Sequence, residues 1–507
     1  MKSLLKILCI AFSSIAVCCS LPKSNVYYID FQRGSDDNSG RSPSAPWKTV
    51  ENLSQIMPGD SVLFKEGIVF AGNILFDSII GSSDSPVVIS SYGKGKAIID
   101  AGDSSGIVIS NSEHVVISRL LIKGSGRLGG SKGNGLKIKR SSYCKIDSIE
   151  VTGFLWSGIN VTGGSNIEVT RVYAHDNGFC GIYAESGEDE YGPDGSKFRT
   201  LRNLRIAFST AENNPGCPDV KDNHSGSGIL IAGVVNGVIE HCEAMHNGWD
   251  MPREGNGPVG IWAYMSDSII IRYCYSHHNK TSAKGKDGGG FDFDGGVTNS
   301  MMQYNLSAFN EGAGYGIFQY AGATTWSNNL MCYNISYADG LKNGEAGIFM
   351  WYDPIALPMK NFHAFNNTIV SGRKYAVNFD PGIYEDFLFE NNIFLLTGTS
   401  ERFIGGDFKG ANFRNNIYWS VENNNTKIEQ PSVIYENSSL VKDPLIFMPD
   451  SADFKISIGK LALLPYFKLK ANSPCIGKGR PIKIISTDFW GNRVSNNIGA
   501  DASQPRK

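Results

Sequence analysis

The sequence predicts an all-β protein, a single-stranded right-handed parallel β-helix that forms a solenoid with a cap at each end. The first observation is a short motif, a glycine followed by alternating apolar residues, whose successive glycines lie 23 to 47 residues apart. Such a repeat predicts stacked units that each add one coil. The second observation is that no amphipathic segment of helix length alternates with these strands, which disfavours a solenoid of strands and helices. The copies are Gly135-Leu-Lys-Ile, Gly158-Ile-Asn-Val, Gly181-Ile-Tyr-Ala, Gly228-Ile-Leu-Ile, Gly260-Ile-Trp-Ala, Gly290-Phe-Asp-Phe, Gly316-Ile-Phe-Gln and Gly347-Ile-Phe-Met.

The composition supports the same fold class. The chain has 507 residues, of which 58 are glycine and 11% are aromatic, as strands and tight turns require. Because a solenoid grows along one axis, this length does not require several globular domains. The 47 Lys and Arg residues balance 49 Asp and Glu residues, and the net charge of -2 argues against a nucleic-acid partner, whose binding depends on neutralised phosphates.

The first 19 residues resemble a signal peptide. Two lysines precede an apolar run from Ile7 to Val17, and Cys18 or Cys19 follows at the place of a lipid-modified cysteine. Lipidation would attach the chain to a membrane. We therefore expect an extracytoplasmic monomer, either a periplasmic or outer-membrane lipoprotein or, without lipidation, a secreted protein.

The remaining cysteines predict neither a disulfide framework nor a zinc site. Seven of the ten cysteines follow the leader, an odd number without close spacing. Cys242 and Cys274 each stand five residues before an asparagine. We expect these two thiols to lie buried on neighbouring coils, because free cysteine packs as a small hydrophobic residue.

We divide the mature chain into three parts. Residues 25–105 supply the N-terminal cap and the first coils, which cover the strand edges at the end of a solenoid. Residues 106–440 form the β-helix core and carry the catalytic face, and residues 441–507 close the C-terminal end. Three insertions rich in glycine, proline and charge are expected to overhang one face: residues 186–199, 212–227 and 248–258.

A second repeated position predicts a polar ladder. Asn177, Asn247, Asn279, Asn310 and Asp339 each follow a strand at the same point of the repeat. Asparagine tolerates the left-handed conformation of a tight turn, and its amide can bond to the amide one coil above. We interpret these residues as a structural ladder and not as ligands.

A glycine-rich segment contains the strongest candidates for catalysis. Phe291 and Phe293 should face the core, so that Asp292 and Asp294 project outward with Cα atoms roughly 6.5–7 Å apart. Two close carboxylates raise the pKa of one of them and give an acid beside a base, as glycoside hydrolysis needs. The required separation is about 5–5.5 Å for retention and about 6.5–9.5 Å for inversion, and side-chain rotamers span both. Asp287, just ahead of the strand, is the third candidate.

Outward-facing aromatic residues border the two aspartates in this register. One pair of rings is placed one coil before the aspartates, a second pair one coil after them, and a third pair two coils after them. In this register Phe318 is level with Asp292, and Tyr320 is level with Asp294. Coils stack about 4.8 Å apart, so exposed rings would cover about 15–20 Å of surface. Flat sugar faces that stack on them would explain large apolar residues on the wet side of a strand. The residues expected to bind substrate are Trp262, Tyr264, Phe318, Tyr320, Phe349, Trp351, Tyr183, Glu185 and Arg253.

Several stretches resemble secreted right-handed parallel β-helix proteins of polysaccharide-degrading bacteria. The resemblance covers nearly the whole mature chain and implies the fold and a carbohydrate-active enzyme, although β-helices host hydrolases, lyases and epimerases alike. Polygalacturonase-type hydrolases of this class use clustered aspartates on one β-helix face. The stretches are Pro46-Trp-Lys-Thr-Val, Gly59-Asp-Ser-Val-Leu-Phe-Lys-Glu-Gly, Gly257-Pro-Val-Gly-Ile-Trp-Ala-Tyr and the run from Asp287 to Gly296.

Three functions fit these observations. The first is a glycoside hydrolase with Asp292 and Asp294 as acid and base and Asp287 assisting, which cleaves a polysaccharide or oligosaccharide. The second is a non-catalytic glycan-binding surface protein, which would need the rings but not the acids. The third is a polysaccharide lyase or uronate epimerase, which needs a cation against the uronate carboxylate and a base for the C5 proton. Its Ca²⁺ would be held by Asp287, Asp292, Asp294 and Glu185, and its base would be Lys284, Lys286 or Arg253.

Overall fold

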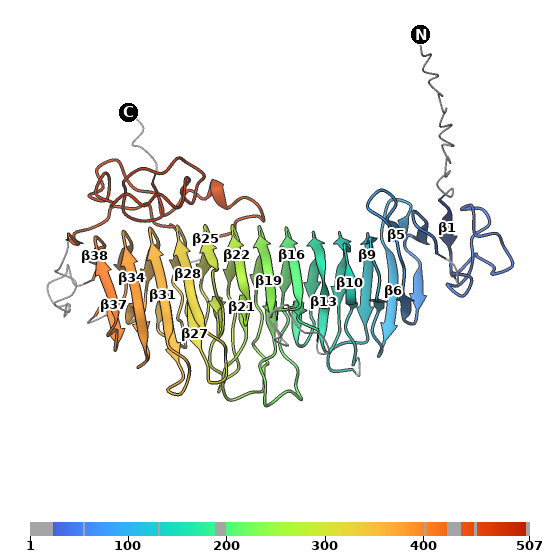
Figure 1. Cartoon of the computed structure of the whole chain (residues 1–507), viewed down its shortest axis with the longest axis horizontal. Helices are drawn as coiled ribbons and strands as arrows, with labels where there is room; N and C mark the ends of the chain where they lie inside the picture. The colour runs from blue at the N-terminus through green and yellow to red at the C-terminus, as the bar shows by residue number, and fades with distance from the viewer. Residues whose placement is uncertain are drawn as a thin grey trace, which may run out of the picture.

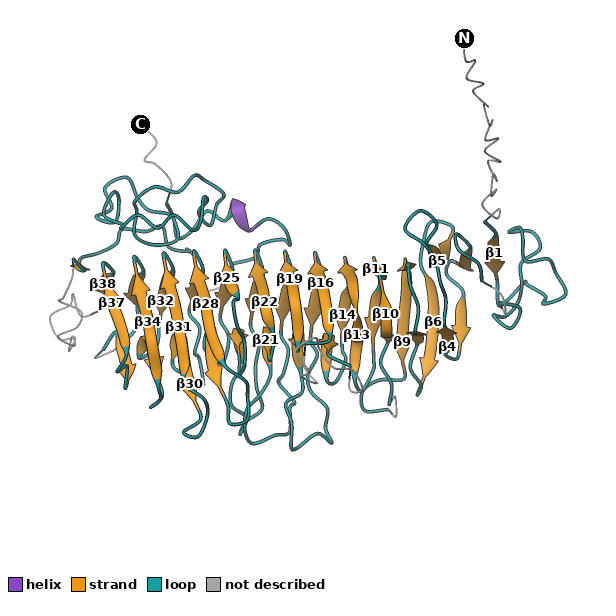
Figure 2. Ribbon diagram, in the orientation of Figure 1, coloured by secondary structure: helices purple, strands orange, loops and turns teal. Residues whose placement is uncertain are grey.

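The computed structural model describes residues 24–53, 56–129, 132–187, 199–399, 402–422, 438–450 and 454–502. It confirms the parallel β-helix: short strands stack side by side along one long axis, with a loop-rich C-terminal segment beside the stack (Figures 1 and 2). The predicted signal peptide, with Cys18 and Cys19, lies outside the described residues. Within those residues, no helix is both long and apolar enough to cross a membrane.

Each coil contributes strands to three faces, and neighbouring coils pair in parallel. The first face carries the candidate site. Its strands, in stacking order, are β4 (Ile74–Asp77), β7 (Ile107–Ser110), β10 (Leu136–Ser142), the first half of β13 (Ser157–Thr170), β15 (Cys180–Glu185), β18 (Ser227–Ala232), β21 (Val259–Tyr264), β24 (Gly289–Phe293), β27 (Tyr315–Gln319), β30 (Ala346–Tyr352), β33 (Tyr375–Phe379) and β36 (Ile404–Gly406).

The second face joins the first through the long strand β13, so the two form one 25-stranded sheet. Its other strands are β1 (Val26–Ile29), β2 (Ser61–Lys65), β5 (Val87–Tyr92), β8 (Val115–Ser118), β11 (Lys145–Asp147), β16 (Leu201–Ala207), β19 (Val234–Glu240), β22 (Asp267–Arg272), β25 (Met301–Gln303), β28 (Trp326–Cys332), β31 (Met359–Phe365), β34 (Tyr384–Glu390) and β37 (Ala411–Arg414).

The third face is a separate 14-stranded sheet. The one helical element among the described residues is the 3-10 turn η1 (Leu461–Leu463) in the C-terminal segment (Figure 2). The third face consists of β3 (Val69–Ala71), β6 (Ala97–Gly102), β9 (Leu120–Gly124), β12 (Glu150–Thr152), β14 (Tyr173–His175), β17 (Thr210–Glu212), β20 (Glu243–Met245), β23 (Tyr275–His277), β26 (Leu306–Ala308), β29 (Ile335–Tyr337), β32 (Thr368–Ser371), β35 (Ile393–Leu396), β38 (Ile417–Ser420) and β39 (Leu440–Val441).

The alternation of the repeat fills the core as predicted, except in one coil. Phe291 and Phe293 of β24 lie fully buried inside the helix. In the next coil, however, Tyr315 and Ile317 stack on them, so Gly316 lies level with Asp292. The predicted register of this repeat, which put Phe318 level with Asp292, is therefore wrong by two residues. The error arose because the glycine that starts this coil is Gly314, whereas Gly316 points outward.

The polar ladder is confirmed. Asn247 donates a side-chain hydrogen bond to Asn279 Oδ1 over 2.9 Å, and Asn279 donates to Asn310 Oδ1 over 3.0 Å. Asn214 also belongs to it, and the sequence assignment of 212–227 to an insertion had hidden this residue. The predicted stacking of buried Cys242 and Cys274 is confirmed as well. A second ladder, not predicted, joins Asn305, Asn334, Asn367, Asn392 and Asn416.

Replacing Asn279 by alanine should destabilise the whole helix. The buried amide donates to Asn310 and to the Ala244 carbonyl and accepts from Asn247, so its loss leaves buried groups without partners. We expect the free energy of unfolding to fall by about 2–3 kcal/mol. The matched control is Asn52→Ala on an exposed turn, where the amide donates one hydrogen bond to the Asp36 carbonyl and a change within about 0.5 kcal/mol is expected. Denaturant unfolding measures both, and equal losses would contradict the role of burial.

The C-terminal segment, which the sequence assigns to closing the end of the helix, lies along the side of several coils (Figure 1). It contacts these coils through hydrogen bonds from Tyr304 to Thr487 and from Asn366 to Asn497. Apolar packing accompanies these bonds, because the segment's Phe467 and Trp490 belong to one cluster with buried residues of the coils.

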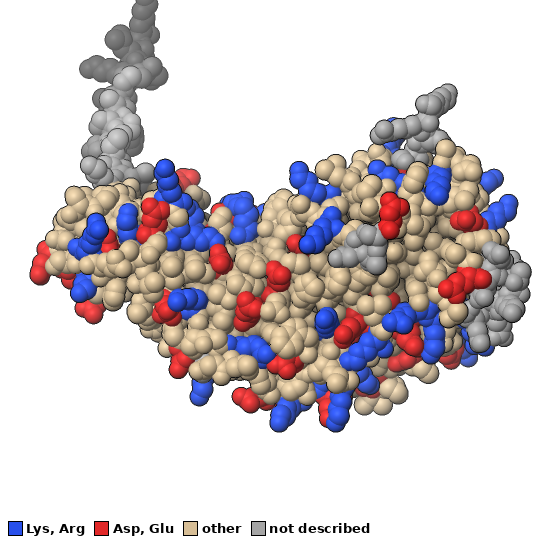
Figure 3. Space-filling model, turned by 180° about the vertical axis from the view of Figure 1, so that it is seen from behind, with Lys and Arg blue, Asp and Glu red and all other residues tan. Residues whose placement is uncertain are grey.

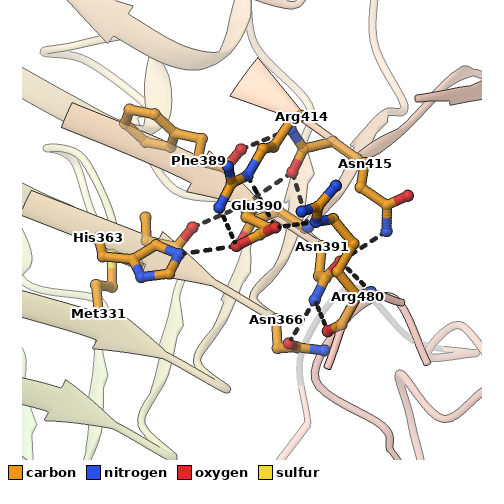
Figure 4. Close-up of polar contacts among 12 residues, drawn as sticks. Met331, His363, Asn366, Phe389, Glu390, Asn391, Arg414, Asn415 and Arg480 are labelled. Atoms are coloured by element: carbon orange, nitrogen blue, oxygen red, sulfur yellow. Dashed lines mark hydrogen bonds and ion pairs between the residues drawn. The ribbon is translucent and has the colours of Figure 1, made fainter. Parts of the chain in front are cut away.

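A buried carboxylate fixes this segment to the helix (Figure 4). Glu390, whose side chain is 3% exposed, pairs with Arg414 and with Arg480 of the segment, each at 2.9 Å, and with His363 at 3.4 Å. Burial would raise the pKa of Glu390, but the bonds from His363 and Arg414 hold it below its usual value. The charged pairs therefore compensate the desolvation of the carboxylate.

Candidate functional site

A cavity of about 580 Å³ opens on the first face over strands β21, β24, β27 and β30. The loops that the sequence marked as insertions form its wall, since Asn223 and His224 come from one and Arg253 and Asn256 from another. In Figure 1, loops extend from the stack next to the strands labelled β21 and β27. Acidic and basic side chains are interspersed over the face seen in Figure 3, so neither sign of charge dominates that face.

Asp292 projects from the centre of β24 into the base of this cavity. Because Phe291 and Phe293 point inward, Asp292 must point outward. It is nevertheless only 2% exposed, and its Oδ1 has no hydrogen-bond partner. A methyl group on Gly316 would lie 3.0 Å from this oxygen, so the glycine leaves the space that Asp292 occupies. Burial, and then the charges of Asp294 and Asp287, raise the pKa of Asp292 well above its ordinary value.

Asp294 follows the strand and reaches a more open part of the cavity. Its backbone N–H donates to the Ala263 carbonyl, and its Oδ1 accepts a hydrogen bond from Gly295 N–H over 2.7 Å. Burial, and then the charge of Asp287, raise the pKa of Asp294 to about 7, although the Gly295 bond opposes the shift. Since its side chain is only half-buried, this carboxyl can touch a bound molecule.

Asp287 enters the cavity from the turn before β24, in a left-handed backbone conformation with φ of 58°. Its Oδ2 accepts from Gly257 N–H over 2.7 Å, and its carbonyl accepts from the Asn343 side chain over 3.1 Å. Burial raises the pKa of Asp287 to about 6, and the Gly257 bond and the charges of Lys286 and Arg253 limit the shift. One loop thus holds the carboxylate of Asp287, and a second loop from another coil holds its backbone.

All six predicted aromatic residues line the cavity, but two are not the exposed rings that the sequence predicted. Trp262 is 4% and Phe318 8% exposed. Trp262 donates from Nε1 to Ser227 Oγ over 3.1 Å and lies beneath the inserted loop, while Phe318 is covered by the edges of the rings that follow it. Four rings remain partly exposed to the cavity: Tyr264, Tyr320, Phe349 and Trp351.

Among the other candidates, Arg253 and Lys286 line the cavity, whereas Tyr183, Glu185 and Lys284 do not. Tyr183 and Glu185 lie on β15, two coils before β21, where the Tyr183 hydroxyl donates to Glu185 Oε2 over 2.8 Å, and Lys284 pairs with exposed Glu254. The sequence missed further lining residues because they lie on insertions or turns with no motif: Asn223, His224, Asn256, Asn343 and Asp380.

The calcium site that a lyase would need is not formed by the predicted residues. Within the part of the chain that the structure describes, no group of three or more His, Cys, Asp or Glu residues is arranged to hold a metal ion. Asp287 and Asp294 direct oxygens to backbone N–H groups, and Glu185 lies outside the cavity. Asp287, Asp292, Asp294 and Glu185 therefore do not come together as one group of ligands among the residues that the structure describes.

The raised pKa of Asp292 makes the protein less stable as pH rises. The unfolded chain releases this proton near pH 4, whereas the folded chain keeps it, so stability is lost above about pH 4. Asp292→Asn removes this titrating group, and with it the difference in bound protons between the folded and the unfolded chain. We expect the melting temperature of this variant to exceed that of the wild type by a margin that grows from pH 4 to 8. Asp84→Asn, on an exposed turn, should give a constant difference. A margin that shrinks with pH would show that Asp292 is ionised in the fold.

Comparison with known proteins places the fold among carbohydrate-active proteins. The family model described as the Pel9A-like, right handed beta helix region matches residues 27–347. Lacto-N-biosidase of Bifidobacterium longum subsp. longum is 24% identical over 611 residues, which cover 94% of this chain. The chain spans only 36% of that curated relative.

Two solved structures show the same architecture. GH136 lacto-N-biosidase from Eubacterium ramulus has a TM-score of 0.50 and 18% identity, over 67% of this chain and 64% of that one. Pectate lyase Pel9A has a TM-score of 0.50 and 16% identity, over 96% of this chain and 98% of that one. At these identities the likeness shows the fold, and one fold hosts both a biosidase and a lyase.

Proposed function

The chain belongs to the family of Pel9A-like right-handed β-helix proteins, and we propose that it is a glycoside hydrolase whose cavity binds an oligosaccharide or the end of a polysaccharide. The observation that carries the proposal is the group formed by Asp287, Asp292 and Asp294, the first and last of them partly exposed, inside a cavity that Asp380 and aromatic rings also line. The name of the curated relative, a biosidase, supports the same class of reaction.

The roles of the aspartates follow from their accessibility and their pKa values. Asp292 is too deeply buried to touch a substrate, so Asp287 and Asp294 are the reacting pair. Asp294, with a pKa of about 7, holds the proton and donates it to the glycosidic oxygen as general acid. Asp287, with a pKa of about 6, is the ionised partner that attacks the sugar or activates water. This assignment exchanges the roles that the sequence gave Asp287 and Asp292.

Asp292 acts through its neighbours in this proposal. A protonated carboxyl below the reacting pair adds no negative charge to the cavity, whereas an ionised one would repel both Asp287 and Asp294. The apolar surroundings formed by Trp262 and Phe318 keep its proton in place. We regard Asp292 as a positioning residue and not as a catalytic one.

The lyase alternative has one observation in its favour, which is the presence of Arg253 and Lys286 at the cavity. These cations could face a uronate carboxylate, and Lys286 could serve as base. These cations already lower the pKa of Asp287, however, and Asp380 is a further carboxyl group that lines the cavity. The two positive charges therefore already face carboxyl groups of the chain, and an uncharged sugar requires no further cation.

A panel of neutral and uronate-containing glycans tests the proposal. Purified protein is incubated with galactan, xylan, neutral host-type oligosaccharides, polygalacturonate and alginate, and both reducing ends and ultraviolet absorbance are recorded. The proposal expects reducing ends without absorbance from at least one neutral glycan. Unsaturated, ultraviolet-absorbing products from a uronate polymer would instead support the lyase.

A further inference from the structure

His224 is a polar side chain of the cavity that the hydrolytic mechanism does not use. It lies on the inserted loop between β17 and β18. Its ring meets Trp262 edge to face, with centroids 4.8 Å apart and planes at 76°, and it also contacts Phe179 at 5.6 Å. Packing against rings therefore holds the imidazole in the wall of the cavity.

The imidazole is held without polar bonds of its own. Nδ1 is buried and has no hydrogen-bond partner, and Nε2 makes no hydrogen bond to any residue that the structure describes. Among the described residues, the one hydrogen bond of His224 is donated by its backbone N–H to Asn223 Oδ1 over 2.8 Å. Because Nδ1 is closed off from the cavity, Nε2 is the nitrogen that a bound molecule can reach, and a bond there would give the otherwise unpaired imidazole a polar partner.

The surroundings of His224 keep it neutral. Burial, and then the charge of Arg253, lower the pKa of His224 to about 4. The groups packed against the ring are otherwise uncharged, namely Phe179, Trp262 and Tyr264. A neutral imidazole can both donate and accept a hydrogen bond, as a sugar hydroxyl or an acetamido group requires.

We propose that His224 and Tyr264, which pack against the buried Trp262, form a subsite that selects an uncharged sugar ring. The half-exposed Tyr264 ring lies 5.4 Å from Trp262 and offers a surface for stacking, while His224 bonds to a hydroxyl or acetamido group of the same sugar. This inference rests on the proposed function and adds the substrate class. A site built around such a bond rejects analogues that lack the group.

An NMR titration tests the subsite without any need for turnover. Side-chain ¹H–¹⁵N correlations of the histidines are followed while glucose, glucuronate, galactose, galacturonate or N-acetylglucosamine is added to the wild-type protein. We expect at least one neutral sugar to shift the His224 signals more than its uronate counterpart, and His241 to stay unshifted. His241 is a matched control, because it also stacks between rings but lies outside the cavity. The proposal is overturned if no neutral sugar shifts His224, or if uronates shift it more.

Kinetics on the best neutral glycan provide the second readout. We expect His224→Ala to lower kcat/KM about 10- to 100-fold, mainly through KM, and His224→Gln to recover part of the loss by restoring a hydrogen bond. His241→Ala should change kcat/KM less than twofold. Hydrolysis that is unaffected by His224→Ala would overturn the subsite and leave the proposed hydrolase intact. If no glycan is hydrolysed, the proposed function fails, while the titration still decides on the subsite.

Discussion

Replacing Asp294 or Asp287 by asparagine is expected to lower kcat for glycoside hydrolysis by about 10²–10⁴-fold while the fold is retained. Asparagine keeps the size of each side chain but can neither donate the acid proton nor carry the negative charge. KM should change little, because both carboxylates act on the reacting bond. Steady-state kinetics and far-ultraviolet circular dichroism measure the two quantities.

Glu185→Gln is the matched control for this pair. Glu185 is a half-buried acid on the same face of the helix, bonded to Tyr183, but outside the cavity. Its kcat should stay within about twofold of the wild type. A loss in the control as large as in Asp294→Asn would mean that the aspartates act through stability alone. Full activity of both aspartate variants would remove them from the mechanism.

The pH profile of kcat/KM is expected to be a narrow bell with its maximum between about pH 6 and 7. Asp287 must be ionised, so activity rises with pH through its pKa of about 6. Asp294 must be protonated, so activity falls as pH rises through its pKa of about 7. Two pH units below the pKa of Asp287 or above that of Asp294, kcat/KM should be about 100-fold lower than at its maximum. Only about 1% of the enzyme then has both carboxyl groups in the required protonation state.

Two lysines allow the acidic limb to be assigned. Lys286 lowers the pKa of Asp287, so Lys286→Gln should move the acidic limb of the bell to higher pH and leave the basic limb in place. Lys284→Gln is the control, since Lys284 pairs with Glu254 and lies outside the cavity. Profiles of the three proteins, recorded at constant ionic strength, make the comparison. A shift of the basic limb instead would exchange the roles of the two aspartates.

The fold was predictable because each coil repeats the same physical demand. A strand with two inward apolar residues recurs in every coil, and one side of the turn needs an amide that bonds to the next coil. The register failed at Gly316 because two glycines stand two residues apart, so both positions satisfy the motif. Only stacking against Phe291 and Phe293 decides between them.

The site was predictable only in part, because its walls come from loops. Asp292 and Asp294 follow from strand alternation, and so do the six rings. The burial of Trp262 and Phe318, and the entry of His224, depend on how inserted loops fold back over the face, for which the sequence has no periodic signal. For the same reason the sequence could not tell that Asp287 is more accessible than Asp292.

Mass spectrometry of products formed in isotope-labelled water tests the central claim most directly. The wild-type protein digests the best glycan of the panel in water enriched in heavy oxygen, with and without a chelator. The proposed hydrolase must place one labelled oxygen at each newly formed reducing end and none at the new non-reducing end, and the chelator should not change the rate. Unlabelled, unsaturated products whose formation the chelator stops would contradict hydrolysis by the aspartate pair.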